Sequence, residues 1–571
     1  MAAKDAPSIP PTVRELTPRA LLTGLVLGAV LTPCNIYSGL KIGWSFNMSI
    51  TSLLLAFAFW IPVTRALGLA QWQMLESNIT QTAASAASSI ISGGLVAPIP
   101  ALAIMTGGNL PWLEVAAWVF AVSFLGLWVG WYLRPQLIVQ SNLVFPAGMA
   151  IAETMRATFS HGREAMKRVG VLMGSLALSA LVKAIDVLVW QIPRLAPSFT
   201  AKKLTLALDP SLLLLGFGSI IGLRAGLGLL AGALLAWGVI GPELIAREIV
   251  DVSGRTEDWF QPLVGWLLWP GVTLMVVASL TSFAAALIGG VRGPRAQGEE
   301  VVREAGSKVR LGGFAVAAGL TVVLQVILFD IHWTMAFIAI PMAFVLAMVS
   351  ARVVGETSVA PIGAIGKVSQ LSFGVMAPGQ PITNLMTANV AGGAAGACAD
   401  LLDDFRAGHQ VGARPARQVA AQCAGVAVGS LVGSLVYLTL ITDPARQLLT
   451  PEWPAPAVAT WKAVADALGS GISGVPPSAL AAMGIAGVCG VALALIERRV
   501  SDRRLLLVPS GAAFGLAFVI PAGTSITLFL GALGASILHR LAPNWSSSFL
   551  LSAAAGFVAG ESLFGVFAVW L

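Results

Sequence analysis

Apolar runs of about 20 residues recur from Ala20 to the C-terminal Leu571, and this recurrence limits the fold more than any other feature of the sequence. Each run is long enough for an α-helix to cross the hydrocarbon of a bilayer. Charged residues make up only 11% of the 571 residues, whereas about 25% is usual in a soluble domain. The sequence therefore predicts an all-α polytopic membrane protein with about 14–16 transmembrane helices.

The positions of Lys and Arg predict how the chain is threaded through the bilayer. The net charge is +7, but the basic residues are divided among short loops rather than gathered in one stripe, which disfavours nucleic-acid binding. Cytoplasmic loops carry the Lys/Arg excess, so the basic loops after Arg156, near residue 300, around 406–417 and around 498–504 should lie inside. The connections 247–261 and 442–474 are poorer in Lys and Arg and contain Trp, which is typical of the outer interface.

The first 20 residues lack the basic region, apolar core and cleavage site of a signal peptide, so the first helix should be retained. We expect an integral protein of the cell (inner) membrane with a cytoplasmic N-terminus. The expected organisation is a cytoplasmic tail (1–18), an N-terminal transmembrane half (19–290), a cytoplasmic loop (291–310) and a C-terminal transmembrane half (311–571).

Two segments are too short to cross the membrane twice although both of their ends should lie inside. They are residues 134–156 and 505–540, and both contain Pro-Ala-Gly, in VFPAGMA (144–150) and VIPAGTS (519–525). A third stretch, 355–380, is rich in Gly and Pro. Such backbone is tolerated at membrane depth only where it is buried in protein or lines a watery cavity. We therefore expect re-entrant or broken helices in two pseudo-related halves.

The stretch NIYSGLKIGWSF (35–46) interrupts an apolar run with polar residues and Lys41. Lys41, between two glycines, has a loose counterpart in Lys367, and matching interrupted segments in two halves indicate a transporter binding site. The counterpart's spacing does not match, since Lys41 precedes Pro146 by 105 residues and Lys367 precedes Pro521 by 154. Lys41 could instead extend along the helix end to reach the interface.

Motifs for nucleotide hydrolysis, metal binding and covalent catalysis are missing from the sequence. The run Gly363-Ala-Ile-Gly366-Lys367 lacks the first Gly and the Ser/Thr of a phosphate loop. The four His residues are far apart, and the four Cys residues show no CxxC spacing. We expect no enzymatic activity, no cofactor and no metal site.

Acidic residues inside apolar segments are functional candidates, because a charge at the centre of a membrane helix costs about 2.5 to 3.5 kcal/mol. Glu153, Glu356 and Glu561 are the candidates for proton coupling. Other charged residues have simpler interpretations. The alternatives are a mutually neutralising pair for Lys183 and Asp186, a similar pair for Glu153 and Arg156, and a solvated helix end for Asp403, Asp404 and Arg406.

Several motifs, taken together and in this order, resemble the oligopeptide transporter (OPT) superfamily. They are Asn35-x-Tyr37-x-Gly39-Leu40-Lys41-x-Gly43-Trp44, Phe145-Pro-Ala-Gly148, Gly355-Glu356-Thr357 with Pro361 and Gly363, DLLDDFRAGHQVGARPARQVAAQ (400–422) and Gly560-Glu561. The resemblance implies a secondary transporter, usually proton-coupled, that imports small peptides or, in the yellow-stripe branch, metal ions held by organic chelators. The chain lacks the SPYxEVR-like and KIPPR-like motifs of the eukaryotic peptide branch and is more similar to the yellow-stripe and prokaryotic side. Peptide and metal chelate both stay open.

We therefore expect a proton-driven symporter whose substrate cavity lies near the membrane midplane between the broken segments. Lys41 and Lys367 would hold an anionic group of the substrate. The full set of expected substrate-binding residues is Asn35, Tyr37, Lys41, Trp44, Pro146, Lys367, Gln370 and Pro521. The alternative is a passive channel for small solutes or ions, since re-entrant loops also build selectivity filters. The partners are substrate, protons and lipid, and a homo-oligomer is compatible with the sequence.

Overall fold

The computed structural model describes residues 14–570 except 46, 142, 161, 254–257, 292–306, 358–361, 470–474 and 501–507. The part that it describes is helical, and its one extended pairing is an isolated bridge between Leu195 and Leu208. The elements up to residue 291 are α1 (Pro18–Ile42), α2 (Ser49–Ala66), α3 (Met74–Ser88), η1 (Ser89–Gly93), α4 (Pro98–Thr106), α5 (Trp112–Arg134), η2 (Pro135–Val139), α6 (Pro146–Ser160), α7 (Gly162–Leu188), α8 (Phe199–Lys203), α9 (Leu212–Ala233), η3 (Leu234–Ile240), α10 (Gly241–Ala246) and α11 (Phe260–Val291). The later elements are α12 (Ser307–Phe329), α13 (Trp333–Thr357), α14 (Ile362–Met376), α15 (Pro381–Val411), α16 (Pro415–Leu440), α17 (Pro444–Gln447), α18 (Pro456–Gly469), α19 (Pro477–Arg499), α21 (Gly511–Leu516), α22 (Ala522–Leu541), α23 (Pro543–Phe567) and η5 (Ala568–Trp570).

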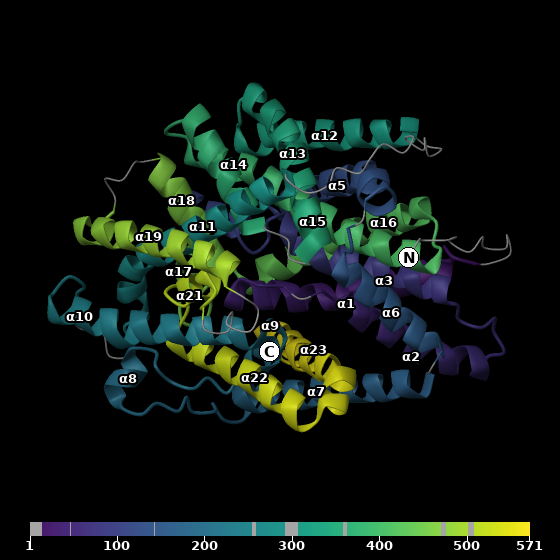
Figure 1. Cartoon of the computed structure of the whole chain (residues 1–571), viewed down its shortest axis with the longest axis horizontal. Coiled ribbons are helices and arrows are strands. Elements are labelled where there is room, and N and C mark those ends of the chain that lie inside the picture. The colour runs from purple at the N-terminus through teal and green to yellow at the C-terminus, as the bar shows by residue number, and fades with distance from the viewer. Residues whose placement is uncertain are drawn as a thin grey trace.

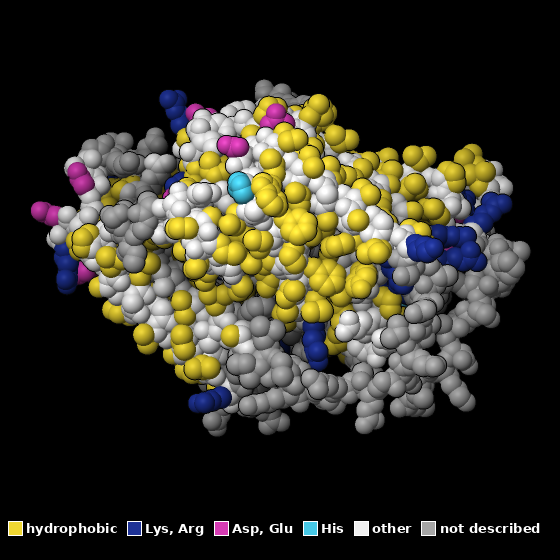
Figure 2. Space-filling view, turned by 90° about the horizontal axis from the view of Figure 1, so that it is seen from above, with side chains coloured by type: hydrophobic (Ala, Val, Ile, Leu, Met, Phe, Trp, Pro, Cys, Tyr) yellow, Lys and Arg dark blue, Asp and Glu magenta, His cyan; other side chains and the backbone are white. Residues whose placement is uncertain are grey.

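Fourteen helical segments of the described chain are long and apolar enough to cross a membrane. Many of the long helices, among them α1, α7 and α19, run along the long axis of the molecule (Figure 1). Hydrophobic side chains cover the middle of the face in Figure 2, and the largest group of Lys and Arg on that face lies toward one end. The expected all-α polytopic membrane fold is confirmed.

Capping residues mark both ends of helix α1, and the helix extends further toward its C-terminus than we expected. Thr17 caps its start by accepting a hydrogen bond from the Ala20 N–H, and Pro18 occupies the first turn. Gly43 ends the helix in the left-handed conformation, with φ of 75°. The expected interruption at 35–46 is therefore wrong for its first residues, since 35–42 form the last two turns of α1. The polar side chains of this stretch project from a regular helix.

The three segments expected to be broken each contain a short helix. Helices α6 and α14 have 15 residues each, and α21 has six. A helix of 15 residues is roughly 22 Å long, which is less than the hydrocarbon thickness of about 30 Å. The second Pro-Ala-Gly segment also includes α22, whose 20 residues make it one of the candidate spans. This segment thus consists of a short helix, α21, followed by a long helix, α22.

Small residues allow the helices around α15 to approach closely. A side chain added at Gly126 of α5 would lie 2.4 Å from the Ala394 carbonyl oxygen, and one added at Gly425 of α16 would lie 2.3 Å from the Ala83 carbonyl oxygen. Both carbonyls belong to the small-residue tracts 82–94 and 388–400. Helix α15 is consequently enclosed by α3, α5, α6, α13, α14 and α16.

Candidate substrate-binding pocket

One pocket of the described structure has a volume of about 1210 Å³. Its walls are the C-terminal parts of α1, α7, α16 and α23, the N-terminal ends of α9 and α22, and the connections 189–211 and 441–455. Three of the expected functional residues line it together, namely Tyr37 and Lys41 from α1 and Glu561 from α23. The pocket thus joins residues from the two ends of the sequence.

Lys41 lies in the last turn of α1 and faces two aromatic rings. Its Nζ atom is 5.6 Å from the centre of the Tyr37 ring and 5.2 Å from the centre of the Trp453 ring. The two rings meet edge to face, with their centroids 5.2 Å apart. The Ala455 N–H donates to the Leu40 carbonyl at 2.9 Å, which ties the Trp453 segment to α1. In the described chain Lys41 has no ion pair, so aromatic faces are what its charge contacts.

Glu561 lies at the start of α9, because α23 passes beside that helix end. Its Oε1 atom accepts a hydrogen bond from the Ser211 hydroxyl at 2.8 Å, and its Oε2 atom accepts one from the Leu213 N–H at 2.8 Å. Ser211 is the capping residue of α9 and also accepts from the Leu214 N–H. A carboxylate at a helix N-terminus satisfies unpaired N–H groups and the helix dipole. The observed contacts of Glu561 therefore hold α9 in place at the pocket wall.

The pocket carries charges of both signs. Lys183 and Asp186 form the expected ion pair on α7 at 2.8 Å, and Arg194 and Asp209 pair at 3.7 Å. In the described chain Glu452 has no ion pair, as is also true of Lys41. The charged side chains that line the pocket are Lys41, Lys183, Arg194, Lys202 and Arg446, and Asp186, Asp209, Asp258, Glu452 and Glu561. Such a lining can hold a molecule that carries both ammonium and carboxylate groups.

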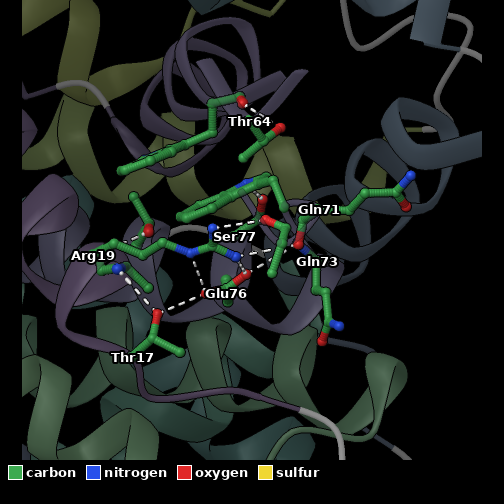
Figure 3. Close-up of polar contacts among 12 residues, drawn as sticks. Thr17, Arg19, Thr64, Gln71, Gln73, Glu76 and Ser77 are labelled. Carbon is green, nitrogen blue, oxygen red and sulfur yellow. Dashed lines mark hydrogen bonds and ion pairs between the residues drawn. The ribbon is translucent and has the colours of Figure 1, made fainter. Parts of the chain in front are cut away.

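The opposite end of α1 is held by a buried ion pair, shown in Figure 3. The Arg19 guanidinium contacts Glu76 at the start of α3, with the nearest oxygen at 2.6 Å, and Glu76 is fully buried. Thr17 donates a third hydrogen bond to this carboxylate at 2.7 Å. Arg19 also lies over the rings of Trp60 and Trp72, 5.4 and 5.3 Å from their centres. We call this set the α1 latch; its five residues are Thr17, Arg19, Trp60, Trp72 and Glu76.

Lys367 and Gln370, which were expected to line the same cavity as Lys41, lie elsewhere. Lys367 of α14 is 2% exposed. Its Nζ atom donates to Gln370 Oε1 at 2.8 Å and lies 4.3 Å from the centre of the Trp461 ring. Gln370 in turn donates to the Trp461 carbonyl at 3.1 Å. These residues form a separate buried cluster between α14 and α18.

The remaining expected substrate contacts are also spread over the molecule. Asn35 is buried on α1 and donates to the Ser88 carbonyl at 3.0 Å. Trp44 is half-buried just beyond α1, and Pro146 is exposed at the start of α6. Pro521 precedes α22 and lines a smaller neighbouring pocket of about 490 Å³, which shares Thr524 with the large one.

Of the other two expected proton-coupling acids, Glu153 lies outside the large pocket. Glu153 is exposed on α6. Its expected partner Arg156 donates to the Gln410 carbonyl. Glu356 belongs to the last turn of α13, and its side chain is outside the described residues.

One interpretation made from the sequence is wrong. Asp403 and Asp404, expected at a solvated helix end, are only 6% and 1% exposed, because α15 continues through them to Val411 and is surrounded by other helices. Trp453 and Trp461, in the connection 442–474 that we expect on the outer side, are buried at 6% and 7% exposure, because they pack against α1 and α14. The side of the membrane on which this connection lies stays a prediction. The small-residue tract before Asp403 was the available signal that α15 is central.

Comparison with known proteins agrees with this architecture. The family model for the OPT oligopeptide transporter protein matches residues 15–571. The Saccharomyces cerevisiae protein YGL114W, provisionally named an oligopeptide transporter, is 24% identical, and the match covers 97% of this chain and 96% of that protein. The metal-nicotianamine transporter YSL2 of Arabidopsis thaliana is 28% identical over 50% of this chain and 47% of its own length. The chain belongs to the OPT oligopeptide transporter family.

Proposed function

We propose that the protein is a secondary active transporter that couples the import of a small zwitterionic substrate, a peptide or a metal chelate, to protons. The observation that carries the proposal is the large pocket, in which Lys41 meets aromatic rings while the walls carry both signs of charge. A volume of about 1210 Å³ slightly exceeds the 300 to 1,000 Å³ or so of a drug-sized ligand site. An oligopeptide or a chelator-bound metal ion is of the matching size.

Lys41 is the residue best suited to bind a substrate carboxylate. Because the cation–π contacts leave its N–H donors without a carboxylate partner in the described chain, a carboxylate can approach without breaking an existing ion pair. The acidic residues of the same pocket, among them Glu452, are suited to the ammonium group of a peptide or of an amino-acid chelator. The relatives' names, which include oligopeptide and metal-nicotianamine transporters, fit these two substrate classes.

The two ends of α1 support alternating access rather than an open pore. Lys41 borders the pocket at the C-terminal end of α1. The α1 latch holds the N-terminal end of this helix against α3, and Arg19 lies 22 residues or roughly 33 Å from Lys41. A transporter exposes its site to one side at a time. Opening on the latch side would require the Arg19 and Glu76 contacts to separate.

Uptake by reconstituted vesicles tests the proposal. The purified protein in liposomes, under an imposed proton gradient, should take up a labelled oligopeptide or a metal–nicotianamine complex in a saturable, gradient-dependent manner. Lys41→Ala should reduce this uptake about tenfold or more, since a charge-assisted hydrogen bond contributes roughly 1.5–3 kcal/mol. Lys308→Ala, at an exposed position outside the pocket, is the matched control and should have no effect.

Two results would contradict the proposal. Uptake that is neither saturable nor gradient-dependent with any of these probes would remove active transport. Single-channel currents across a planar bilayer would favour the passive channel instead.

A further inference from the structure

A small apolar pocket of about 180 Å³ lies apart from the large one. Its walls are the starts of α2 and α6 and the first halves of α7 and α23. Ala147 and Ala150 form part of the α6 wall. Ala147 is the alanine of the first Pro-Ala-Gly segment, so this expected broken segment borders a cavity, although not the one that contains Lys41.

Helices α7 and α23 line both pockets. On α7, Leu172 lines the small pocket and Val182 lines the large one, and ten residues or about 15 Å separate them. On α23, Ala555 and Glu561 line the small and the large pocket, and they are six residues or about 9 Å apart. The two pockets therefore lie one after the other along this pair of helices.

A buried apolar cluster lies between the two pockets on the same helices. Its members, which we call the barrier cluster, are Leu31, Cys34, Met48, Leu176, Ala559 and Leu563. Leu176 and Ala559 each follow a residue of the small pocket by one helical turn. Cys34 precedes Tyr37 of the large pocket by about one turn. A thin layer of apolar side chains thus separates the two pockets.

Helix α2 leads from the barrier cluster to the α1 latch. Met48 of the cluster immediately precedes α2, Thr51 of the small pocket is in its first turn, and Trp60 of the latch is in its second half. Trp60 donates to the Thr23 hydroxyl of α1 at 2.9 Å. On α1, Cys34 likewise lies between the large pocket and the latch. The order is therefore large pocket, barrier cluster, small pocket and latch.

Helices α7, α9, α22 and α23 form one packed group, seen in the lower part of Figure 1. A side chain added at Gly560 of α23 would lie 2.9 Å from the Ser179 Cβ atom of α7. Ser179 also donates to the Phe557 carbonyl of α23 at 2.7 Å. Glu561 holds the start of α9 through the hydrogen bonds described above. These contacts favour movement of the group as a unit.

Helices α1 and α3 form a second group. A side chain added at Gly28 would lie 2.6 Å from the Ala87 Cβ atom, and Thr32 donates to the Ala87 carbonyl at 2.9 Å. Between the two groups, the Cys34 thiol reaches the Ala559 carbonyl at 3.9 Å, which is a weak contact. The other side chains of the barrier cluster are apolar. Such a seam can open without the loss of strong hydrogen bonds.

We propose that the substrate leaves the large pocket through the small one, and that the barrier cluster is the gate between them. The gate opens when the group of α7 and α23 moves away from α1 and the start of α2, as one bundle rocks against another in transporters of known mechanism. The proposal rests on the proposed function, because it extends the route of the same peptide or metal chelate. The small pocket widens together with the gate to admit that substrate.

The reactivity of Cys34 in the full-length protein tests the gate. One variant keeps only Cys34, with Ala at Cys398, Cys423 and Cys489. N-ethylmaleimide should label it slowly without substrate, because Cys34 is 0% exposed. The peptide or metal–nicotianamine complex that is taken up should raise the labelling rate about tenfold or more, since a minor state is populated at only about 0.1–10% without ligand. A variant that keeps only Cys398, equally buried on α15, is the matched control and should show no increase.

Each outcome of the labelling experiment bears on the gate or on the proposed function. Uptake of substrate without any change in Cys34 labelling overturns the gate. Labelling of Cys34 without substrate at the rate of a variant that keeps only the exposed Cys489 also overturns it, because the route would then be permanently open. A wild type without gradient-dependent uptake contradicts the proposed function, while slow labelling of Cys34 relative to Cys489 would still support a closed barrier.

A side chain that fills the small pocket tests the route and keeps all native cysteines. Ala150 lines this pocket and is exposed. Ala150→Phe should leave substrate binding in detergent unchanged, but it should lower the maximal rate of uptake about tenfold or more, because overpacking raises the barrier to translocation. Ala315→Phe, at an exposed position of α12 outside both pockets, is the matched control and should have no effect. Unchanged uptake by Ala150→Phe overturns the route and is the result expected if the pocket holds a lipid acyl chain instead.

Discussion

The ammonium group of Lys41 lies 5.2 Å from the centre of the Trp453 ring. This contact joins the last turn of α1 to the connection that precedes α18. It therefore fixes where the Lys41 ammonium group lies and gives it an aromatic ring as its partner. A cation over an indole face is stabilised by about 0.5 to 2 kcal/mol. The contact leaves the ammonium N–H groups free to bind an anionic substrate, and it makes Trp453 a positioning residue.

Replacement of Trp453 should therefore weaken substrate binding without abolishing folding. Trp453→Ala is expected to raise the KM for uptake about 2- to 30-fold, because Lys41 loses the ring that orients it. Trp453→Phe retains an aromatic face and should have a smaller effect. The concentration dependence of uptake in vesicles measures both. A larger effect of Phe than of Ala would argue against the cation–π contact as the cause.

The α1 latch should contribute strongly to stability. Glu76→Gln leaves the Arg19 charge without its carboxylate at a site where Glu76 is fully buried, and breaking a buried pair in this way typically costs about 3–5 kcal/mol. Partial exposure of Arg19 places the expected loss toward the lower end of that range. Thermal unfolding in detergent measures it. The exposed pair of Arg247 and Glu243 is the control, and Glu243→Gln should cost at most about 1 kcal/mol.

Close packing between α5 and α15 makes Gly126 intolerant of a side chain. Gly126→Ala would place a methyl group 2.4 Å from the Ala394 carbonyl oxygen, and the forced separation should destabilise the protein by about 1–3 kcal/mol. Gly174→Ala on α7 meets nothing within 4 Å, so it should be neutral or stabilising by up to about 1 kcal/mol. Retention of the folded peak in gel filtration after heating distinguishes the two. Equal stability of both variants would contradict the packing argument.

Low pH should stabilise the packing of the segment before α1, which contains Glu15, against Arg414 and Arg417. We call this packing the docked state. Burial raises the pKa of Glu15, and hydrogen bonds from Arg414 and Arg417 offset this only in part. The docked state therefore binds a proton more tightly than the undocked state. This contribution to docking is complete below the ordinary pKa of 4.5 and is lost as pH rises through the raised pKa. Hydrogen exchange of residues 14–17 across this range measures it, and Glu15→Gln should remove the pH dependence.

Local physical chemistry explains which parts of the fold could be predicted. An apolar run of about 20 residues must form a helix in lipid, and Thr17, Pro18 and Gly43 mark the ends of α1 through capping rules that act within a few residues. The ion pair of Lys183 and Asp186 was also predictable, because residues three apart on a helix are neighbours. Each of these results depends on a short stretch of chain.

The site could be predicted only in part, because its members meet through packing. The motif that contains Lys41 was a sound indication of a pocket wall, but nothing near it in the sequence shows that Trp453 and Glu561 complete that wall. Lys367 has a similar local pattern and lies in another cluster, because α18 covers it with Trp461. A local pattern specifies a side chain and its helix face, and the neighbouring helices decide what it meets.

The sequence by itself determined an all-helical membrane protein, the family to which it belongs, and the set of charged residues from which a site could be built. The tertiary structure alone decided that Tyr37, Lys41 and Glu561 share one pocket and that Asp403 and Asp404 are buried among the helices around α15. The physical reason is that helix formation is governed by hydrogen bonds between near neighbours. Which charges are buried together depends on contacts between helices that are distant in the chain.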